Sequence, residues 1–518
     1  MGPLRTITES LQAHPGIAVG LHLVVTAVFG WLARDEVRAG WRLTGRDFWL
    51  GTLAAMALAL AASAVVVPGL TRHGWEGHEA MYLDLFEDRP SGESVEDSPL
   101  LVAPLPAAVY TAMGKVPGLP PLSMVLLNLA LGALAVGASA WNARLLTGDD
   151  RTGIVAGLLT ALHPLLAFWS SSAYQVILPC ALGQLAITAL LLARQRPSTR
   201  TLALAAALWG LAVASRVEYV LLAPALVALW LLGGRRTLRE FRRWLPALGI
   251  GAVLGGLHLL PLGLAAVTRD TGEPLAYYLG MFRYHLLWSD VWDPYDALWT
   301  WPALGIGFAL LALRGRGGWA ALAGVGAIAL AFHLPYCAFW DYATRHTLLP
   351  VAAVATVVAA GIAGTWERGP AGRVVAGALA VGCGVPLVLG LGMARQRYYA
   401  DADVLPRVVR GVDWDHPLAL EPYVEEGCYL VTEHPVLWDA YPTGSHVNIA
   451  DPLEGPQIWA AHGGCVLWLR DADDVRWTSR DVMSRAWKLE HLFDWEPVGS
   501  IELDDGFRAA VYRLLTPP

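Results

Sequence analysis

The sequence predicts an all-α polytopic membrane bundle of eleven or twelve spans in residues 1–393, followed by a small extracytoplasmic α/β domain in residues 394–518. Hydrophobic residues make up 55% of the chain and charged residues only 16%, whereas about a quarter of a soluble protein is charged. The hydrophobic residues form continuous blocks close to the ~20 residues that a helix needs to cross ~30 Å of hydrocarbon. These blocks lack the alternating pattern of barrel strands, so helices are the predicted spanning elements.

The predicted spans follow one another through most of the chain, at residues 17–33, 48–69, 119–141, 152–170, 174–193, 201–215, 218–233, 244–266, 299–313, 319–338, 347–364 and 374–393. The first block is longer than the apolar core of a signal peptide, and four arginines follow it, so we interpret it as a span. A helix lying on the membrane surface is the alternative, and it leaves eleven spans.

Arginine placement orients the bundle, because Arg and Lys accumulate in short cytoplasmic loops. One alternating set of connections carries most of them: Arg34, Arg38, Arg42, Arg46, Arg144, Arg151, Arg194, Arg196, Arg200, Arg235, Arg236, Arg239, Arg242, Arg243, Arg314, Arg316, Arg368 and Arg373. These connections are predicted to be cytoplasmic. Residues 70–118, residues 267–298 and the C-terminal tail are then predicted to face outward.

The tail alternates short apolar strands with polar stretches, which is typical of a small α/β domain. The predicted strands are Cys428–Thr432, Cys465–Leu469 and Ala509–Leu514, and a helix is expected at 481–492. Cys428 and Cys465 could form a disulfide in this compartment or remain two buried thiols, and both readings stay open. No Cys/His spacing matches a metal site and no basic tract suggests nucleic acid. We find no phosphate-binding glycine loop, so no cofactor is expected, while a divalent metal stays open.

The first outer segment carries the densest group of chemically active side chains, directly after an outward-going span: Glu76, His78, Glu79 and Asp84. A carboxylate there is expected at the level of the lipid headgroups. The apolar stretch Leu101–Met113 follows Asp97-Ser98-Pro99-Leu100 and is too short to span, so it is predicted to lie along the interface. A solvated acidic loop is the simpler alternative.

This order of features, over roughly residues 48–365, resembles the membrane glycosyltransferases that use polyprenol-phosphate sugars, the superfamily of protein O-mannosyltransferases and lipid A aminoarabinose transferases. In that family an outward span leads into an Asp-Glu-x-x-(Tyr/Phe) element and then a Pro-Pro-Leu-like interfacial helix. His78-Glu79-Ala80-Met81-Tyr82 and Ser98-Pro99-Leu100 occupy these places. His78 stands where the family has Asp, so the resemblance implies Glu79 as the base but leaves Glu76 and Asp84 open.

Two arginines on the outer side belong to further segments that resemble the family. The segment Ser215-Arg216-Val217-Glu218 is similar to its Leu-Thr-Arg-Pro-Glu turn, and the segment from Tyr342 to Pro350 is similar to its Arg-Tyr-x-Leu-Pro start of a late span. Arginine suits phosphate because its planar fork donates two hydrogen bonds and stays charged. Arg216 and Arg345 are therefore predicted to bind the donor phosphate. Snorkelling to the interface, or pairing with Glu218 or Asp341, is the alternative for each.

The resemblance implies a GT-C fold and transfer of a sugar from a polyprenyl-phosphate donor to a glycan, lipid or protein acceptor. The reaction would take place, with inversion, on the outer face of a bacterial plasma membrane. A second outer loop would close over the substrate or form an aromatic belt among membrane lipids; its candidate residues are Tyr278, Arg283, Trp288 and Asp293. A lipid or sugar flippase, a transporter and a non-catalytic homologue in an envelope assembly are the alternatives. His22, His163 and His258 within spans are expected to form interhelical hydrogen bonds.

Overall fold

The computed structural model describes the chain in two compact units, which we treat separately. Among the described residues, the helical unit extends to residue 394 and the second unit begins at residue 395. The described residues are 15–66, 85–86, 103–172, 176–232, 244–268, 348–409, 429–432, 446–448, 466–471, 494–502 and 508–515.

The helical unit begins with two helices that bend by 54° at their junction, α2 (Pro15–Leu32) and α3 (Arg34–Arg42). The sequence predicted a loop after the first span, but this segment is helical. Asp35 and Glu36 lie in the first turn of α3 and Arg42 in its last, where these charges favour the helix dipole. The next helix, α4 (Arg46–Val66), is a single apolar helix of 21 residues.

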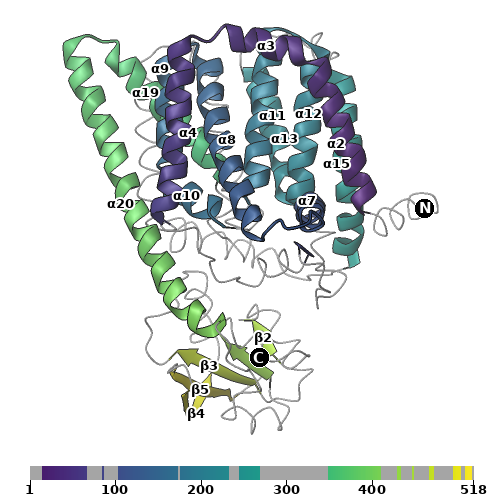
Figure 1. Cartoon of the computed structure of the whole chain (residues 1–518), viewed down its shortest axis with the longest axis vertical. Coiled ribbons are helices and arrows are strands. Elements are labelled where there is room, and N and C mark those ends of the chain that lie inside the picture. Colours follow the sequence, from purple (N-terminus) through teal and green to yellow (C-terminus); the bar gives the residue numbers. More distant parts are fainter. Residues whose placement is uncertain are drawn as a thin grey trace. The chain divides into compact units, whose positions relative to one another are not determined.

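The middle of the helical unit contains one short helix, one long helix and a broken pair: α7 (Pro104–Gly114), α8 (Leu122–Thr147), α9 (Asp150–Ala161) and α10 (Pro164–Ser170). Figure 1 shows α7 lying across the end of the bundle instead of along it. The predicted single span 152–170 is two helices that bend by 63°. His163 adopts ψ 122° because a residue before proline avoids the helical region, and Pro164 then opens α10.

Six further elements of the helical unit lie within its described residues, namely α11 (Ile177–Gln195), α12 (Thr199–Ser215), the 3₁₀ turn η2 (Val217–Leu221), α13 (Leu222–Leu232), α15 (Leu245–Thr268) and α19 (Leu348–Trp366). The last helix, α20 (Pro370–Val409), continues past residue 394 into the second unit. The two late helices differ sharply in their surroundings. In α19, 89% of the most apolar window is buried, whereas the corresponding value for α20 is 28%.

Five helices among the described residues are long and apolar enough to cross a membrane: α4, α8, α11, α19 and the first 23 residues of α20. The two bent pairs bring the number of possible spans to seven, and α12, η2–α13 and part of α15 add shorter apolar helices. Every predicted span that falls on described residues is helical, although the span 152–170 is the bent pair α9–α10 and the span 218–233 consists of η2 and α13. The predicted spans 299–313 and 319–338 lie outside the described residues.

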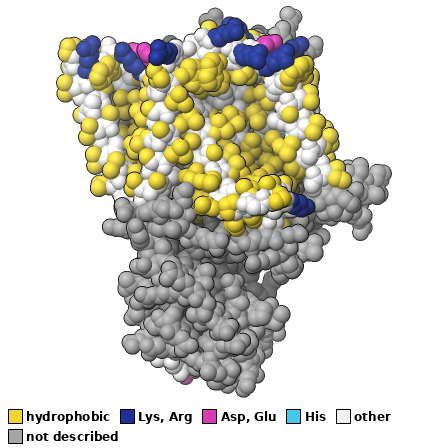
Figure 2. Space-filling view, viewed as in Figure 1, with side chains coloured by type: hydrophobic (Ala, Val, Ile, Leu, Met, Phe, Trp, Pro, Cys, Tyr) yellow, Lys and Arg dark blue, Asp and Glu magenta, His cyan; other side chains and the backbone are white. Residues whose placement is uncertain are grey.

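Basic side chains gather at one end of the helical unit. Figure 2 shows Lys and Arg side chains along the end where α3 lies, and an apolar flank beyond them. Exposed apolar residues such as Leu53 on α4 and Val374 on α20 belong to such flanks. This distribution is the one expected of a bundle whose arginine-rich end faces the cytoplasm.

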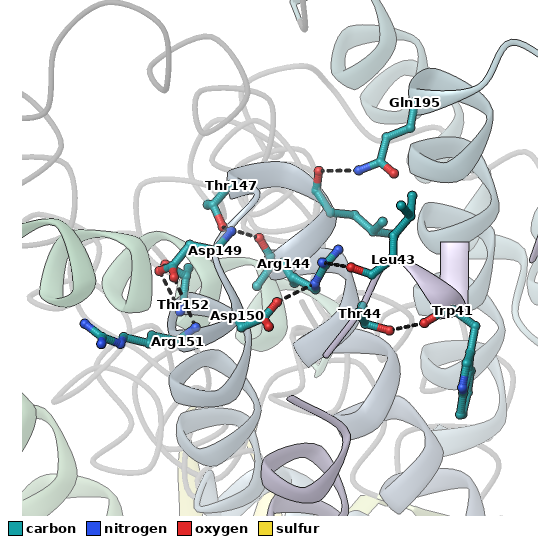
Figure 3. Close-up of polar contacts among 12 residues, drawn as sticks. Trp41, Leu43, Thr44, Arg144, Thr147, Asp149, Asp150, Arg151, Thr152 and Gln195 are labelled. Carbon is teal, nitrogen blue, oxygen red and sulfur yellow. Dashed lines mark hydrogen bonds and ion pairs between the residues drawn. The ribbon is translucent and has the colours of Figure 1, made fainter. Parts of the chain in front are cut away.

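At the arginine-rich end, polar contacts join segments that are far apart in sequence (Figure 3). Arg144 of α8 donates from Nε to Asp150 Oδ1 of α9 at 2.6 Å, and from Nη2 to the carbonyl oxygen of Leu43 at 2.5 Å. The Asp149 carboxylate caps α9 by accepting from the backbone nitrogens of Arg151 and Thr152. Arg144 therefore joins the α3–α4, α8 and α9 segments at this end.

The described strands of the second unit form one mixed sheet of five, in the order β2-β1-β3-β5-β4. Their bounds are β1 (Tyr429–Thr432), β2 (His446–Asn448), β3 (Val466–Asp471), β4 (Trp495–Glu502) and β5 (Arg508–Leu514). The pairs β1–β2 and β1–β3 are parallel, whereas β3–β5 and β4–β5 are antiparallel. The three predicted strands are confirmed within one residue at their starts, and β2 and β4 are additional. Cys428, Cys465 and the helix expected at 481–492 lie outside the described residues.

Strand β3 is buried on both faces of the sheet. Leu467 and Trp468 are 0% and 1% exposed, and successive side chains of a strand point to opposite faces. The Trp468 ring packs near Trp495 and Tyr512, with centroids 5.4 and 5.6 Å away. An apolar strand of this kind is typical of the centre of a covered sheet.

Candidate functional site at the Arg216 end of the bundle

Arg216 lies in the break between α12 and η2, at the end of the bundle opposite the arginine-rich end. Its backbone is extended (φ −157°, ψ 123°), so α12 ends at Ser215. Its guanidinium donates to Glu218 from two nitrogens, with Nη2 2.7 Å from Oε1 and Nε 3.3 Å from both carboxylate oxygens. The side chains are 11% and 23% exposed. The predicted turn between two helices is therefore present, and so is the ion pair that the sequence left as the alternative.

The turn that carries Arg216 is fixed by the residue that follows Glu218. The backbone nitrogen of Tyr219 donates to the Arg216 carbonyl at 3.1 Å, and Trp209 Nε1 donates to the Tyr219 carbonyl at 2.8 Å. Tyr219 itself is 6% exposed. These contacts hold the backbone around Arg216 in one conformation, so the guanidinium is presented from a rigid frame.

Gly183 of α11 brings the two predicted arginine segments into one region. A Cβ on residue 183 would lie 3.0 Å from Tyr219 Cε1 and 3.1 Å from Leu349 Cδ1. Tyr219 follows Arg216 by three residues, and Leu349 follows Arg345 by four. The bare backbone of Gly183 therefore lets η2 and the start of α19 approach α11 at the same place.

The start of α7 packs against the ends of α2 and α12 that lie opposite the arginine-rich end. Leu105 forms a buried apolar cluster with Val19, Leu211 and Ala214, and all four are at most 3% exposed. Ala214 precedes Arg216 by two residues. The interfacial helix predicted at 101–113 is thus a helix at 104–114 that packs beside the Arg216 turn.

The far end of α7 contacts the chain just beyond the acidic segment. A Cβ on Gly114 would lie 2.7 Å from the carbonyl carbon of Phe86 and 3.1 Å from its Cα. Phe86 is 6% exposed and follows Asp84 by two residues. The sequence did not single out this contact, because a glycine at a helix end gives no sign of which backbone approaches it.

Most of the predicted site residues lie outside the described residues. These are Glu76, His78, Glu79 and Asp84 of the first outer segment, Tyr278, Arg283, Trp288 and Asp293 of the second, and Arg345. Their roles remain predictions. In the parts of the chain that the structure does describe, no group of three or more His, Cys, Asp or Glu side chains could hold a metal ion.

The histidines predicted to link helices do so in the case of His22 and His258. His22 Nδ1 lies 3.0 Å from His258 Nε2, and His22 Nε2 lies 2.9 Å from the Ala207 carbonyl oxygen. Because that carbonyl can only accept, His22 carries its proton on Nε2, and His258 Nε2 donates to His22 Nδ1. The two bonds join α2, α12 and α15. His163 is buried at the start of α10.

A protein-family model matches the part of the chain that contains this site. Residues 98–258 match the family described as dolichyl-phosphate-mannose-protein mannosyltransferase. The matched range contains α7–α13 and the Arg216–Glu218 turn and ends within α15. No curated protein sequence matches the chain.

Solved structures of membrane glycosyltransferases resemble most of the chain in fold at low sequence identity. The archaeal oligosaccharyltransferase AglB from Archaeoglobus fulgidus, in complex with an inhibitory peptide and a dolichol-phosphate, is 13% identical with a TM-score of 0.51, covering 90% of this chain and 74% of that one. ArnT from Cupriavidus metallidurans, bound to undecaprenyl phosphate, is 14% identical with a TM-score of 0.46, covering 90% of this chain and 98% of that one. This chain is therefore a multi-pass membrane protein with the GT-C fold of membrane glycosyltransferases, and its residues 98–258 match the mannosyltransferase family model.

Proposed function

We propose that the chain transfers a sugar from a polyprenyl-phosphate donor to an acceptor at the outer face of a bacterial plasma membrane. The family model supports a lipid-phosphate sugar donor, and the fold is that of enzymes that work at a membrane surface. The arginine-rich end faces the cytoplasm, so the Arg216 end and the second unit face outward. The acceptor is a glycan, a lipid or a protein.

The proposed reaction is a single displacement at the anomeric carbon of the sugar. An acceptor oxygen or nitrogen forms the new bond to that carbon while the bond to the phosphate oxygen breaks. A carboxylate of the first outer segment, Glu79 or its neighbours Glu76 and Asp84, takes the acceptor proton. The electron pair of the broken bond stays on the polyprenyl phosphate, where Arg216 and Arg345 stabilise the growing charge. Attack opposite the phosphate inverts the anomeric configuration.

The observation that carries this proposal is the Arg216–Glu218 turn. Arginines otherwise concentrate at the other end of the bundle, and a charge at membrane depth needs a partner. Glu218 supplies that partner in a mostly buried ion pair, and the Tyr219 backbone fixes the frame. The sequence of this turn lies inside the segment that matches the family model. The pairing with Glu218 is also what the alternative to phosphate binding predicted, so the phosphate role of Arg216 rests on the place of this turn within the matched segment.

The competing function, a transporter or flippase, draws support from the buried His22–His258 pair. Ionisable groups within spans often mark transport pathways. Here His22 uses both of its ring nitrogens in bonds that join helices, one to His258 and one to Ala207. This pair therefore links helices, and the transferase is the better-supported function.

The proposal is tested by the lipids of cells that lack the chain. We expect a polyprenyl-phosphate sugar to accumulate in the deletion strain and to disappear when the wild-type chain is returned. Glu79→Gln, Glu76→Gln and Asp84→Asn are then introduced singly. The variant that removes the base should insert normally but leave the donor accumulated, because general-base catalysis contributes about 10²–10⁴-fold to a rate.

The same experiment separates the alternatives. A lipid-linked sugar retained in the inner leaflet of the deletion strain would favour a flippase. Normal turnover of the donor in all three carboxylate variants would show that none of these carboxylates acts as the base. Two variants with wild-type turnover beside one inactive variant would identify the base.

A further inference from the structure

Helix α3 is fixed to the bundle by its inner face. Gly40 is buried there, and a Cβ on residue 40 would overlap the Leu192 side chain of α11. Glu36 Oε1 accepts a hydrogen bond from Ser198 Oγ at 2.9 Å, and Ser198 in turn caps the first turn of α12. Figure 1 shows the result, a short helix that lies across the arginine-rich end of the bundle. The opposite, outer face of α3 is therefore presented in a defined position.

The outer face of α3 carries two arginines that are only weakly paired. Asp35 Oδ1 lies 3.8 Å from Arg34 Nε and 4.0 Å from Arg38 Nη1. The Arg38 and Asp35 side chains are 70% and 76% exposed, and ion pairs of this length and exposure contribute little free energy. Because both guanidinium groups reach the same carboxylate oxygen, one external anion can contact both. Phosphate is an anion that suits the planar fork of arginine.

An exposed apolar stripe on α2 leads directly to these arginines. Its residues are spaced by three and four, so they share one side of the helix, and each is at least 49% exposed: Ile17, Leu21, Val24, Val28 and Trp31. On a helix within a membrane bundle, such a surface faces acyl chains. The Arg34 guanidinium lies over the ring of Trp31, 4.5 Å from its centroid. Tryptophan is typical of the headgroup level, so the cation lies where the stripe of α2 ends.

We propose that α3 and the end of α2 form a binding site for an anionic phospholipid. Its phosphate would contact Arg34 and Arg38, and an acyl chain would lie along the α2 stripe. Amphipathic helices with a basic polar face bind anionic lipids in this way. An acidic protein partner would also be attracted by two arginines, but the apolar stripe that continues from them favours a lipid. The site depends neither on the proposed sugar transfer nor on which leaflet contains the arginine-rich end.

Arg151 of α9 provides a matched control at the same end of the bundle. Its side chain is exposed, like those of Arg34 and Arg38. The residues on the same side of α9 in the next two turns, Val155 and Leu158, are only partly exposed and do not continue an exposed apolar stripe. Arg151→Gln therefore removes one positive charge from this end without altering the combination of cation and stripe.

The test uses the full chain in detergent, with native mass spectrometry to measure its affinity for added phosphatidylglycerol or phosphatidylcholine. We expect the wild type to bind phosphatidylglycerol at least about tenfold more tightly. Arg34→Gln and Arg38→Gln together should weaken this binding about 10- to 30-fold, because each arginine near an anionic headgroup contributes a factor of about five. Arg151→Gln should change it less than about twofold. Trp31→Leu keeps an apolar side chain but removes the ring under Arg34, and should weaken binding about two- to fivefold.

Asp35→Asn separates a binding site from a general loss of structure. The substitution removes the carboxylate that competes with phosphate for Arg34 and Arg38, so phosphatidylglycerol should bind about two- to fivefold more tightly. A disordered α3 would lower the affinity instead. Weaker or unchanged binding in Asp35→Asn would contradict a phosphate position between the two arginines.

Three further results would overturn the proposal. Equal affinity of the wild type for the two phospholipids would show that the site does not recognise an anionic headgroup. Unchanged lipid affinity in the double arginine variant would leave these arginines to an acidic protein partner or to water. Glycerol phosphate, which lacks acyl chains, should bind far more weakly than phosphatidylglycerol. Equal binding of the two would exclude the α2 stripe from the site and with it the assignment to a lipid.

Discussion

Burial of the Arg216 guanidinium costs free energy, and its hydrogen bonds to Glu218 fix its orientation. An arginine so little exposed at the end of a membrane bundle is tolerated because Glu218 accepts hydrogen bonds from two of its nitrogens. The same pairing orients the planar guanidinium, which a flexible lysine ammonium would not permit. The Arg216 guanidinium is therefore held in a fixed orientation at this end of the bundle.

We expect Arg216→Lys to express and insert normally but to lower sugar transfer about 100-fold. The charge remains, but the two-nitrogen fork that pairs with Glu218 is lost, and loss of one such electrostatic group typically costs about 10²–10³ in turnover. Initial transfer rates in membranes provide the measurement. Arg200→Lys, at an exposed position in the first turn of α12, is the control. A wild-type rate in Arg216→Lys would exclude a role in stabilising the phosphate.

At the scale of elements, close helix packing in this unit depends on particular glycines. A Cβ on Gly210 of α12 would lie 2.7 Å from His22 Cε1 and 3.0 Å from His22 Nε2. The glycine thus provides the space that lets the imidazole reach the Ala207 carbonyl. The hydrogen bond of His22 to Ala207 therefore depends on the missing Cβ of Gly210 where α2 packs against α12.

Gly210→Ala should destabilise the detergent-solubilised chain by about 1–3 kcal/mol, because a methyl group forced into a packed site shifts its neighbours. The measurement is the midpoint of thermal aggregation, with Gly249→Ala as the control because nothing lies within 4 Å of a Cβ there. In a His22→Ala background the same substitution should cost almost nothing, since residues in contact are not additive. An equal loss of stability in both backgrounds would contradict the coupling between Gly210 and His22.

The elements themselves could largely be predicted from the sequence, because long apolar blocks force helices in a membrane. The turn at Arg216 and the helix ending at Gly114 were both expected. The break at His163 was not, although Pro164 was visible, because proline often only kinks a membrane helix. Contacts such as Gly114–Phe86 and Gly183–Leu349 could not be predicted, since each depends on a second segment whose position only the fold defines. The parallel β1–β2 pair could not be predicted either, because the three residues of β2 are too few to show an alternating hydrophobic pattern.

At the scale of the whole molecule, the charge distribution supports the orientation that we propose. The arginine-rich end carries the contacts of Arg144 and the charged helix α3, and the opposite end carries the Arg216 turn and α7. In the orientation that we propose, the short connection at Gly45 lies in the cytoplasm. The second unit follows α20, and the same proposal puts its strands outside.

We expect this orientation to appear in cysteine labelling of intact cells. In a cysteine-free chain, Ser500→Cys on the exposed part of β4 should react with a membrane-impermeant maleimide. Gly45→Cys, also exposed, should react only after the membrane is permeabilised. The reverse pattern would place the Arg216 end in the cytoplasm, and the proposed reaction would then face the wrong compartment.

The burial of α19 has a consequence for how the protein is made. This helix is among the last to leave the ribosome, yet nearly all of its length is enclosed, and it packs against α8, α9 and α11. A segment with so little lipid-facing surface reaches its place only after earlier helices have entered the bilayer and left room for it. We therefore expect these helices to pack fully only after α19 has entered the bilayer, and a chain cut short before residue 348 would leave the surfaces of α8, α9 and α11 that α19 covers without their partner.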